Sequence, residues 1–319
     1  MHNTGQLETR DRPKILVILG PTAAGKSELG IQIAKRIGGE IVNADSLQVY
    51  KYMDIGTAKP SRAERQYIPH HLIDIIDPST EFNAGSYRKA AQEVIRELHK
   101  RGVKIILVGG TYLYVRVLLY GLIEGISADR EIRDELRWLK SDFGVSYVYE
   151  KLKSLDPAAA GRIHPNDYVR IERALEAYYI SGTKMSELQE KHGFKGDEYE
   201  VLKIGISEER GVLRKRIDQR VDRMIEKGLV DEVKKIREMG FGRDLKPMQS
   251  IGYKHINQYV DGEIALDKAI ELIKRDTKRL AKRQMKWLRR DKDINWYRIP
   301  EDLDMVLHRA EDFYNTDYS

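Results

Sequence analysis

The chain has 319 residues, of which 41% are hydrophobic and 33% are charged, a balance typical of a globular protein. It contains no cysteine, which excludes disulfide bonds, thiolate zinc sites and cysteine nucleophiles. No apolar stretch approaches the roughly 20 residues of a membrane span, and the polar N-terminus has no signal-peptide hydrophobic region, so we expect a cytoplasmic protein without a membrane partner. The net charge of +6 is a weak indication of a nucleic-acid partner.

The first predicted elements are a strand over residues 14–19 and a helix over residues 27–37, because a β-branched run precedes apolar residues at helical spacing. The loop between them matches G-x-x-x-x-G-K-[ST], whose backbone N–H groups surround phosphates at a helix N-terminus. Lys26 adds a positive charge, and the Ser27 hydroxyl is a candidate ligand for Mg²⁺. The predicted phosphate site consists of Gly20, Pro21, Thr22, Ala23, Ala24, Gly25, Lys26 and Ser27.

Strands and helices continue to alternate in the first third of the chain, which predicts a parallel sheet with right-handed crossovers. The next predicted elements are strands at 40–43, 71–76 and 103–108 and a helix at 86–101. Residues 129–192 show only amphipathic helical runs, and strand character returns at 200–206. We therefore predict an α/β fold, a P-loop-containing parallel sheet flanked by helices, in residues 1–116 and 200–319, with an all-helical insertion domain at 117–199.

Polar residues follow two of the predicted strands. Asp45 comes just after the second strand, where the carboxyl ends of a doubly wound sheet line the ligand crevice. Its carboxylate is a candidate Mg²⁺ ligand or general base, with a turn or helix N-cap aspartate as the structural alternative. The fourth strand ends in Gly109, Gly110 and Thr111, where NTP hydrolases often carry a Mg²⁺-binding aspartate, and this disfavours ATP hydrolysis.

The motif GTAKP at residues 56–60 is expected to offer Thr57 and Lys59 to the same crevice. Asp74 and Asp77 remain possible substitutes for the missing strand aspartate, although structural roles before a proline fit them better.

Residues 274–292 carry most of the excess positive charge. On a helix, Lys274, Lys278, Lys282 and Lys286 recur every fourth residue opposite an apolar stripe that we expect to be buried, formed by Ile273, Leu280, Trp287 and Leu288. A solvated charged face and a phosphate-backbone footprint both fit this pattern. Because few acidic residues balance the charge, the footprint is at least as well supported.

Further basic and aromatic residues leave two interpretations open. Arg133, Arg170 and Arg173, in the predicted insertion, either pair with acidic neighbours such as Glu172 or reach phosphates. Within residues 249–254 (QSIGYK), a glycine turn places a tyrosine that is able to stack on a base.

Taken together, the segments GPTAAGKS, DSLQVY, GTAKP, LVGGTYLY, HPNDYVRIERALE and KRQMKWLRR resemble the tRNA dimethylallyltransferases, in the same order from about residue 14 to about residue 296. The resemblance implies transfer of a dimethylallyl group from dimethylallyl diphosphate to N6 of adenine-37 in the anticodon loop of tRNA. The absence of cysteine excludes the C-terminal zinc finger of eukaryotic members and indicates the bacterial type.

The chemistry of that reaction assigns roles to these residues. The loop, Lys26 and Mg²⁺ stabilise charge on the diphosphate leaving group, while Asp45 orients the weakly nucleophilic adenine amine and takes its proton. Arg220 resembles the additional diphosphate-binding arginine of the family, and Thr22 completes the predicted catalytic set. The resemblance implies tRNA contacts by Asp45, Ser46, Leu47, Gln48, Thr111, Arg133, Val169, Arg170, Ile171, Glu172, Arg173, Gln249, Gly252, Tyr253, Lys254, Lys282, Arg283, Lys286 and Arg289.

Three other roles compete with this interpretation. A P-loop nucleotide kinase would transfer phosphate from ATP and ignore RNA. An adenylate isopentenyltransferase would prenylate free AMP, but it needs neither a basic C-terminal helix nor a large helical insertion. A non-catalytic RNA-binding module leaves the phosphate loop unexplained. We expect a monomer whose partners are dimethylallyl diphosphate and the tRNA anticodon stem-loop, with the insertion clamping that stem-loop.

Overall fold

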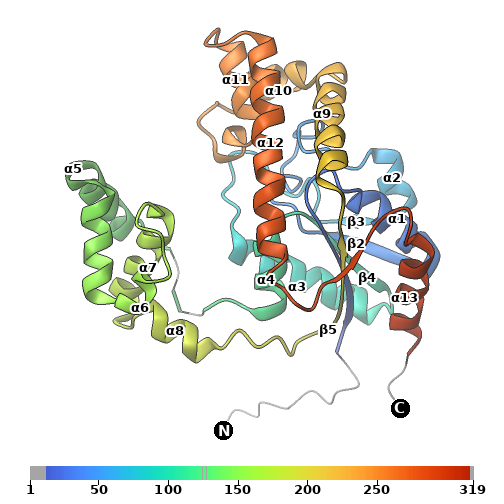
Figure 1. The fold of residues 1–319 in the computed structure, drawn as a ribbon, viewed down its shortest axis with the longest axis horizontal. Helices are drawn as coiled ribbons and strands as arrows, with labels where there is room; N and C mark the ends of the chain where they lie inside the picture. Colours follow the sequence, from blue (N-terminus) through green and yellow to red (C-terminus); the bar gives the residue numbers. More distant parts are fainter. Residues whose placement is uncertain (1–11, 124, 127, 317–319) are drawn as a thin grey trace. The chain divides into compact units, whose positions relative to one another are not determined.

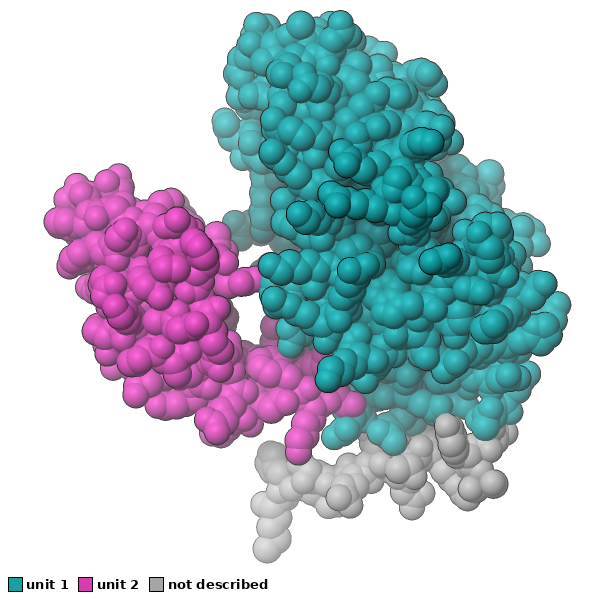
Figure 2. Space-filling view, viewed as in Figure 1, with its two compact units in different colours: residues 1–119, 197–319 teal, residues 120–196 magenta. Residues whose placement is uncertain are grey.

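The computed structural model describes residues 12–123, 125–126 and 128–316. It divides into two compact units (Figure 2). The core unit comprises residues up to 119 and from 197 onward, and the helical unit comprises residues 120–196. The sequence-based prediction placed the insertion at residues 117–199, which differs from the helical unit by three residues at each end.

A parallel sheet forms the centre of the core unit, as the alternating pattern predicts. Its order among the described residues is β3-β2-β4-β1-β5-β6, and every neighbouring pair is parallel. The central strand β1 is apolar on both faces because it is covered on both sides, and Ile15 to Leu19 are at most 1% exposed. The strands are β1 (Lys14–Leu19), β2 (Gly39–Asn43), β3 (His70–His71), β4 (Lys104–Val108), β5 (Glu200–Ile206) and β6 (Asn295–Tyr297).

Helices cover this sheet with their apolar stripes. Leu29 and Ile33 of α1 pack with Leu16 and Ile18 of β1 and with Val306 of the last helix. The sheet-covering and connecting helices are α1 (Lys26–Ile37), α2 (Arg62–Tyr67), α3 (Ala84–Lys100), α4 (Tyr112–Tyr120) and α13 (Leu303–Asn315).

A second group of helices in the core unit packs on the segment that follows β2. Val49 and Met53 share a buried cluster with Val233, Ile256 and Ile273. In Figure 1 the long helix α12 lies beside α9 and α11, in agreement with their direct contacts. These elements are α9 (Arg210–Glu226), α10 (Leu229–Glu238), the 3₁₀ turn η1 (Lys246–Gln249), α11 (Tyr253–Val260) and α12 (Leu266–Leu288).

The helical unit has its own core, which includes Leu136, Leu152, Ile171 and Leu175. Its first helix is broken at Gly144, whose φ of 84° and ψ of 168° are not helical, so this element consists of two helical segments. The elements are α5 (Arg130–Leu155), α6 (Pro157–Ala160), α7 (Tyr168–Ser181) and α8 (Met185–His192).

Two predictions about the fold were incomplete. The strand expected at 71–76 is only the two-residue β3, because the backbone turns through positive φ at Leu72 (61°) and Asp74 (57°). The edge strand β6 and helix α13 were not predicted. Among the described residues, no helix combines the length and apolar character needed to cross a membrane.

Candidate active site

The phosphate loop links β1 to α1 through backbone in the left-handed region. Ala23 has a φ of 65° and Gly25 a φ of 94°, an angle that glycine adopts at little cost. Helix α1 begins at Lys26, and its first N–H groups lack partners inside the helix. The Lys26 ammonium donates to the Pro21 carbonyl at 2.8 Å. The loop therefore has the backbone form of an anion site.

A cavity of about 720 Å³ lies at the carboxyl ends of β1, β2 and β4, and it brings most of the predicted site together. Gly20, Pro21 and Ala24 belong to the loop without lining this cavity. The predicted residues that line it are Thr22, Ala23, Gly25, Lys26, Ser27, Asp45, Ser46, Leu47, Gln48, Thr57, Thr111, Arg220 and Gly252.

Asp45 is held at the edge of the cavity by the ends of β2 and β4. Its Oδ1 accepts from the Leu47 N–H at 2.9 Å, and Thr111 Oγ1 accepts from the Ser46 N–H at 3.0 Å. A Cβ added to Gly110 would lie 4.0 Å from Asp45 Oδ2 and 3.9 Å from Lys26 Nζ. The carboxylate and the ammonium thus approach Gly110 together.

Two partly buried cations face the same cavity. Burial and the nearby Arg220 guanidinium lower the pKa of Lys26 to about 8, although Asp45 opposes this. Burial and Arg223 lower the pKa of Arg220, and Asp45 again opposes the shift. Arg220 Nη1 donates to Thr22 Oγ1 at 3.3 Å. Because the cations disfavour each other's charge, a polyanion between them would stabilise both.

Gln284 is a residue of this cavity that the sequence analysis missed. Its Oε1 accepts from the Thr22 N–H at 2.8 Å, and its Nε2 donates to the Gly110 carbonyl at 3.0 Å. Gln284 lies four residues from both Leu280 and Leu288 of the apolar stripe. A polar residue on the otherwise apolar face of this helix could have indicated in advance that Gln284 contacts polar groups of the core.

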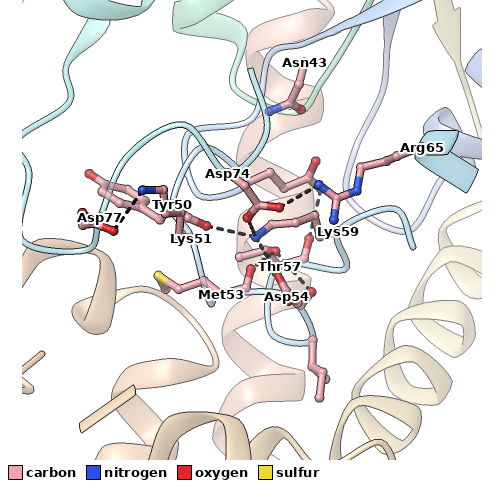
Figure 3. A network of polar contacts seen from close by, with 12 residues as sticks. Asn43, Tyr50, Lys51, Met53, Asp54, Thr57, Lys59, Arg65, Asp74 and Asp77 are labelled. Atoms are coloured by element: carbon pink, nitrogen blue, oxygen red, sulfur yellow. Dashed lines mark hydrogen bonds and ion pairs between the residues drawn. The ribbon is translucent and has the colours of Figure 1, made fainter. Parts of the chain in front are cut away.

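The GTAKP lysine does not serve the cavity as expected. The Lys59 side chain is 1% exposed, and its Nζ lies 2.5 Å from carboxylate oxygens of both Asp54 and Asp74 (Figure 3). Arg65 also pairs with Asp74, at 2.7 Å. Asp77 pairs with Lys51 at 3.4 Å. The two aspartates therefore have the structural roles that the sequence favoured, and the expectation for Lys59 is wrong because its charge is already neutralised.

The ring of Tyr253 packs directly against Gly56. A Cβ on Gly56 would lie 2.6 Å from the ring carbon Cζ of Tyr253, so only glycine fits. Tyr253 is fully buried, and its hydroxyl donates to Glu232 Oε1 at 2.6 Å. The expectation that this ring stacks on a base is therefore wrong, because it is packed beneath the loop.

The rest of the QSIGYK segment faces two different cavities. Gly252 lines the main cavity, whereas Gln249 and Lys254 line a separate polar cavity of about 300 Å³. Gln249 donates to the Arg243 carbonyl at 2.7 Å, and Lys254 lies 3.5 Å from Asp276.

The basic helix α12 has two different halves. Lys274 and Lys278 are neutralised by Asp222 and Asp218 of α9, each at 2.6 Å. In the half near the phosphate loop, Lys282, Arg283 and Lys286 are exposed and have no carboxylate partner among the described residues, and the same holds for Arg289 just after the helix. Trp287 is 38% exposed and lies beneath Arg290, so its predicted burial was wrong.

The predicted arginines of the helical unit are largely anchored to that unit. Fully buried Glu176 binds Arg133 and Arg173, each at 2.6 Å. Ile171 is buried in the core of the unit, so its side chain is not available for the tRNA contact we expected. Exposed groups remain on the same helix, including Val169 and the half-exposed Arg170, which lies 3.4 Å from Asp167, while Glu172 lies 3.6 Å from Arg137.

The oxygen-bearing side chains near the phosphate loop are too few to bind a metal ion alone, but they suit a metal ion that is also bound by a phosphate ligand. Among the described residues, no group of three His, Cys, Asp or Glu side chains is placed to hold a metal. Ser27 is exposed at the start of α1 and lines the cavity with Asp45. Mg²⁺ characteristically binds through one or two protein oxygens, substrate phosphates and water, so this donor set fits it.

Comparisons with known proteins agree with this geometry. The model of the IPP transferase family matches residues 48–291. The tRNA dimethylallyltransferase of Geobacter metallireducens is 47% identical over 97% of this chain and the whole of that relative. The tRNA isopentenylpyrophosphate transferase of Bacillus halodurans has a TM-score of 0.71 and 39% identity, covering 95% of this chain and 97% of that one. A eukaryotic dimethylallyltransferase acting on tRNA has a TM-score of 0.82 and 31% identity, with 94% and 79% covered. The chain belongs to the IPP transferase family, among the tRNA dimethylallyltransferases.

Proposed function

We propose that this chain transfers the dimethylallyl group of dimethylallyl diphosphate to N6 of adenine-37 in tRNA and releases diphosphate. One observation carries the proposal: the Asp45 carboxylate and the Lys26 ammonium both lie within 4.0 Å of the position that a Cβ on Gly110 would take, beside a backbone phosphate loop and Arg220. The site thus offers an anion cradle and a proton acceptor within the same cavity.

The leaving group is the diphosphate. As the bond between the allylic carbon and the bridging oxygen breaks, negative charge grows on that oxygen. Lys26 and Arg220 line the cavity beside the N–H groups at the start of α1, and together they would stabilise this charge. Ser27 would hold Mg²⁺ beside the diphosphate, and the ion would supply further charge neutralisation there.

The nucleophile is the exocyclic amine of adenine, whose lone pair is delocalised into the ring. Asp45 accepts a hydrogen bond from this amine, aligns it with the allylic carbon and receives its proton as the C–N bond forms. The adenine must leave the RNA stack to enter the cavity, and a loop base does so at low cost.

The exposed half of α12 supports RNA as the carrier of that adenine. Lys282 and Lys286, which have no carboxylate partner in the part of the chain that the structure describes, lie on the helix whose Gln284 contacts the phosphate loop. Phosphate groups of tRNA are suitable partners for these cations. Free AMP would not use them, which favours tRNA prenylation over the AMP alternative.

The test is to incubate the protein with labelled dimethylallyl diphosphate and Mg²⁺, offering unmodified tRNA, AMP or ATP. We expect label in tRNA, at adenine-37 after nuclease digestion, with one diphosphate released for each group transferred. Label that enters AMP but not tRNA contradicts the proposal. Transfer of phosphate from labelled ATP would instead identify a kinase.

A further inference from the structure

Gln284 joins three parts of the core unit through a single amide. The Thr22 N–H of the phosphate loop donates to its Oε1 at 2.8 Å, and its Nε2 donates to the Gly110 carbonyl, after β4, at 3.0 Å. The side chain itself extends from α12, a helix of 23 residues. Both polar atoms of the amide are therefore used to fix two backbone segments against one helix.

The two anchored segments bear on the reacting groups. Thr22 also accepts from Arg220, at 3.3 Å, so its position sets that of a diphosphate-binding cation. Gly110 is the residue that Lys26 and Asp45 approach together. A shift of α12 transmitted through Gln284 would move the loop and this junction at once.

The anchoring helix also carries the exposed cations. Lys282 and Lys286 stand two residues on either side of Gln284, and Arg283 is its direct neighbour. The helix is fixed beyond its end by Lys203, whose Nζ lies 2.8 Å from Asp291. RNA held by these cations would restrict α12 at the residue that contacts the phosphate loop.

We propose that Gln284 is a positioning residue that couples RNA binding on α12 to diphosphate binding in the phosphate loop; this rests on the function proposed above. Each ligand favours the α12 placement in which the amide spans Thr22 and Gly110. By linkage, the factor by which tRNA tightens diphosphate binding equals the factor by which diphosphate tightens tRNA binding. Gln284 touches neither reacting atom in this role.

The coupling is measured as the affinity for inorganic diphosphate with Mg²⁺, in the absence and presence of saturating unmodified tRNA, for the full chain. In the unsubstituted protein we expect tRNA to tighten diphosphate binding, within the roughly 5- to 150-fold range typical of allosteric coupling. In Gln284→Met, which keeps the side-chain volume and removes both hydrogen bonds, we expect the factor to fall to within about twofold of one.

Two further variants separate coupling from general damage. Gln32→Met makes the same exchange on α1, where the Gln32 amide donates to Glu28 at 3.2 Å and has no other side-chain hydrogen bond within residues 12–123, 125–126 and 128–316, and it should keep the full coupling. Gln284→Asn keeps an amide but is one methylene too short to span both partners, so it should lose the coupling as Gln284→Met does. It also provides the measurement if the methionine variant fails to fold.

Retention of the coupling in a folded Gln284→Met or Gln284→Asn protein overturns the proposal, and so does its absence from the unsubstituted protein. If instead the unsubstituted protein transfers no dimethylallyl group to tRNA, the proposed function fails, and the two failures are distinguished by that assay.

Discussion

Gly109 lies so close to Ala44 that a Cβ on the glycine would overlap the Ala44 backbone. The contact occurs where β4 and β2 end side by side, with Val108 opposite Asn43. No side chain fits on β4 at this point, so the carboxylate of the cavity comes from Asp45, after β2, instead. This explains in steric terms why the strand lacks the aspartate that is common in NTP hydrolases.

Alanine substitutions at Gly109 and at Gly110 should affect the protein differently, the first through stability and the second through substrate binding. Gly109→Ala forces backbone apart and should destabilise the fold by about 1–3 kcal/mol, as overpacking does. Gly110→Ala brings its Cβ to 2.9 Å from Gln284 Nε2, a side chain that can shift, so it should change stability little and raise KM for dimethylallyl diphosphate. Urea denaturation and steady-state kinetics of both variants check this. If both variants lost the same stability, the difference between a backbone clash at Gly109 and a movable side chain at Gly110 would be contradicted.

Asp45→Asn should keep the fold, because an amide oxygen can still accept from the Leu47 N–H. The amide cannot take the adenine proton, so kcat should fall by about 10²- to 10⁴-fold, the usual contribution of a general base. The tRNA dissociation constant should change by less than about threefold. Asp77→Asn, at a surface ion pair with Lys51, is the matched control and should remain fully active. Near-normal turnover by Asp45→Asn would exclude this residue as the base.

The depressed pKa of Lys26 predicts a pH dependence of substrate capture. The ammonium form binds the diphosphate, and in the free protein it loses its proton with a pKa of about 8. The value of kcat/KM for dimethylallyl diphosphate should therefore be constant below about pH 7, fall to half of that value near pH 8, and decrease further above it, approaching tenfold per pH unit. In Lys26→Arg, whose side chain stays charged throughout this range, the decrease should disappear. A profile shared by both proteins would assign the ionisation to another group.

Glu232 should stabilise the cavity wall through its hydrogen bonds. Its carboxylate accepts from the N–H groups of Asp54, Ile55 and Gly56 at 2.7–3.1 Å, and from the Tyr253 hydroxyl. Glutamine has one acceptor oxygen in place of two, so Glu232→Gln should lower the free energy of unfolding by about 2 kcal/mol. Glu238→Gln, exposed on the same helix, should have no comparable effect in urea denaturation. A destabilisation equal to that control would show that the loop is held by other contacts.

Local sequence predicted the features that depend on neighbouring residues. The phosphate loop, the strands β1, β2, β4 and β5 and the place of Asp45 follow from runs of fewer than ten residues each. What escaped prediction depends on contacts between distant segments. Tyr253 is buried because Gly56 leaves room for its ring, and Lys278 is neutralised by Asp218 of another helix. No periodicity within one helix shows which of its lysines a neighbouring helix will neutralise.

The difference between the paired and the exposed lysines of α12 can be measured through the salt dependence of tRNA binding. Lys282 and Lys286 are exposed without a carboxylate partner in the described parts of the chain, whereas Lys274 and Lys278 are paired with Asp222 and Asp218. Each phosphate contact contributes about 0.7–0.9 to the slope of log affinity against log salt. Neutralising Lys282 and Lys286 with glutamine should therefore reduce the slope by about 1.4–1.8, since two contacts are removed. The same change at Lys274 and Lys278 should reduce it far less, because those charges are already balanced. Equal slopes in the two double variants would mean that tRNA does not distinguish the halves, and that the exposed cations serve only solvation.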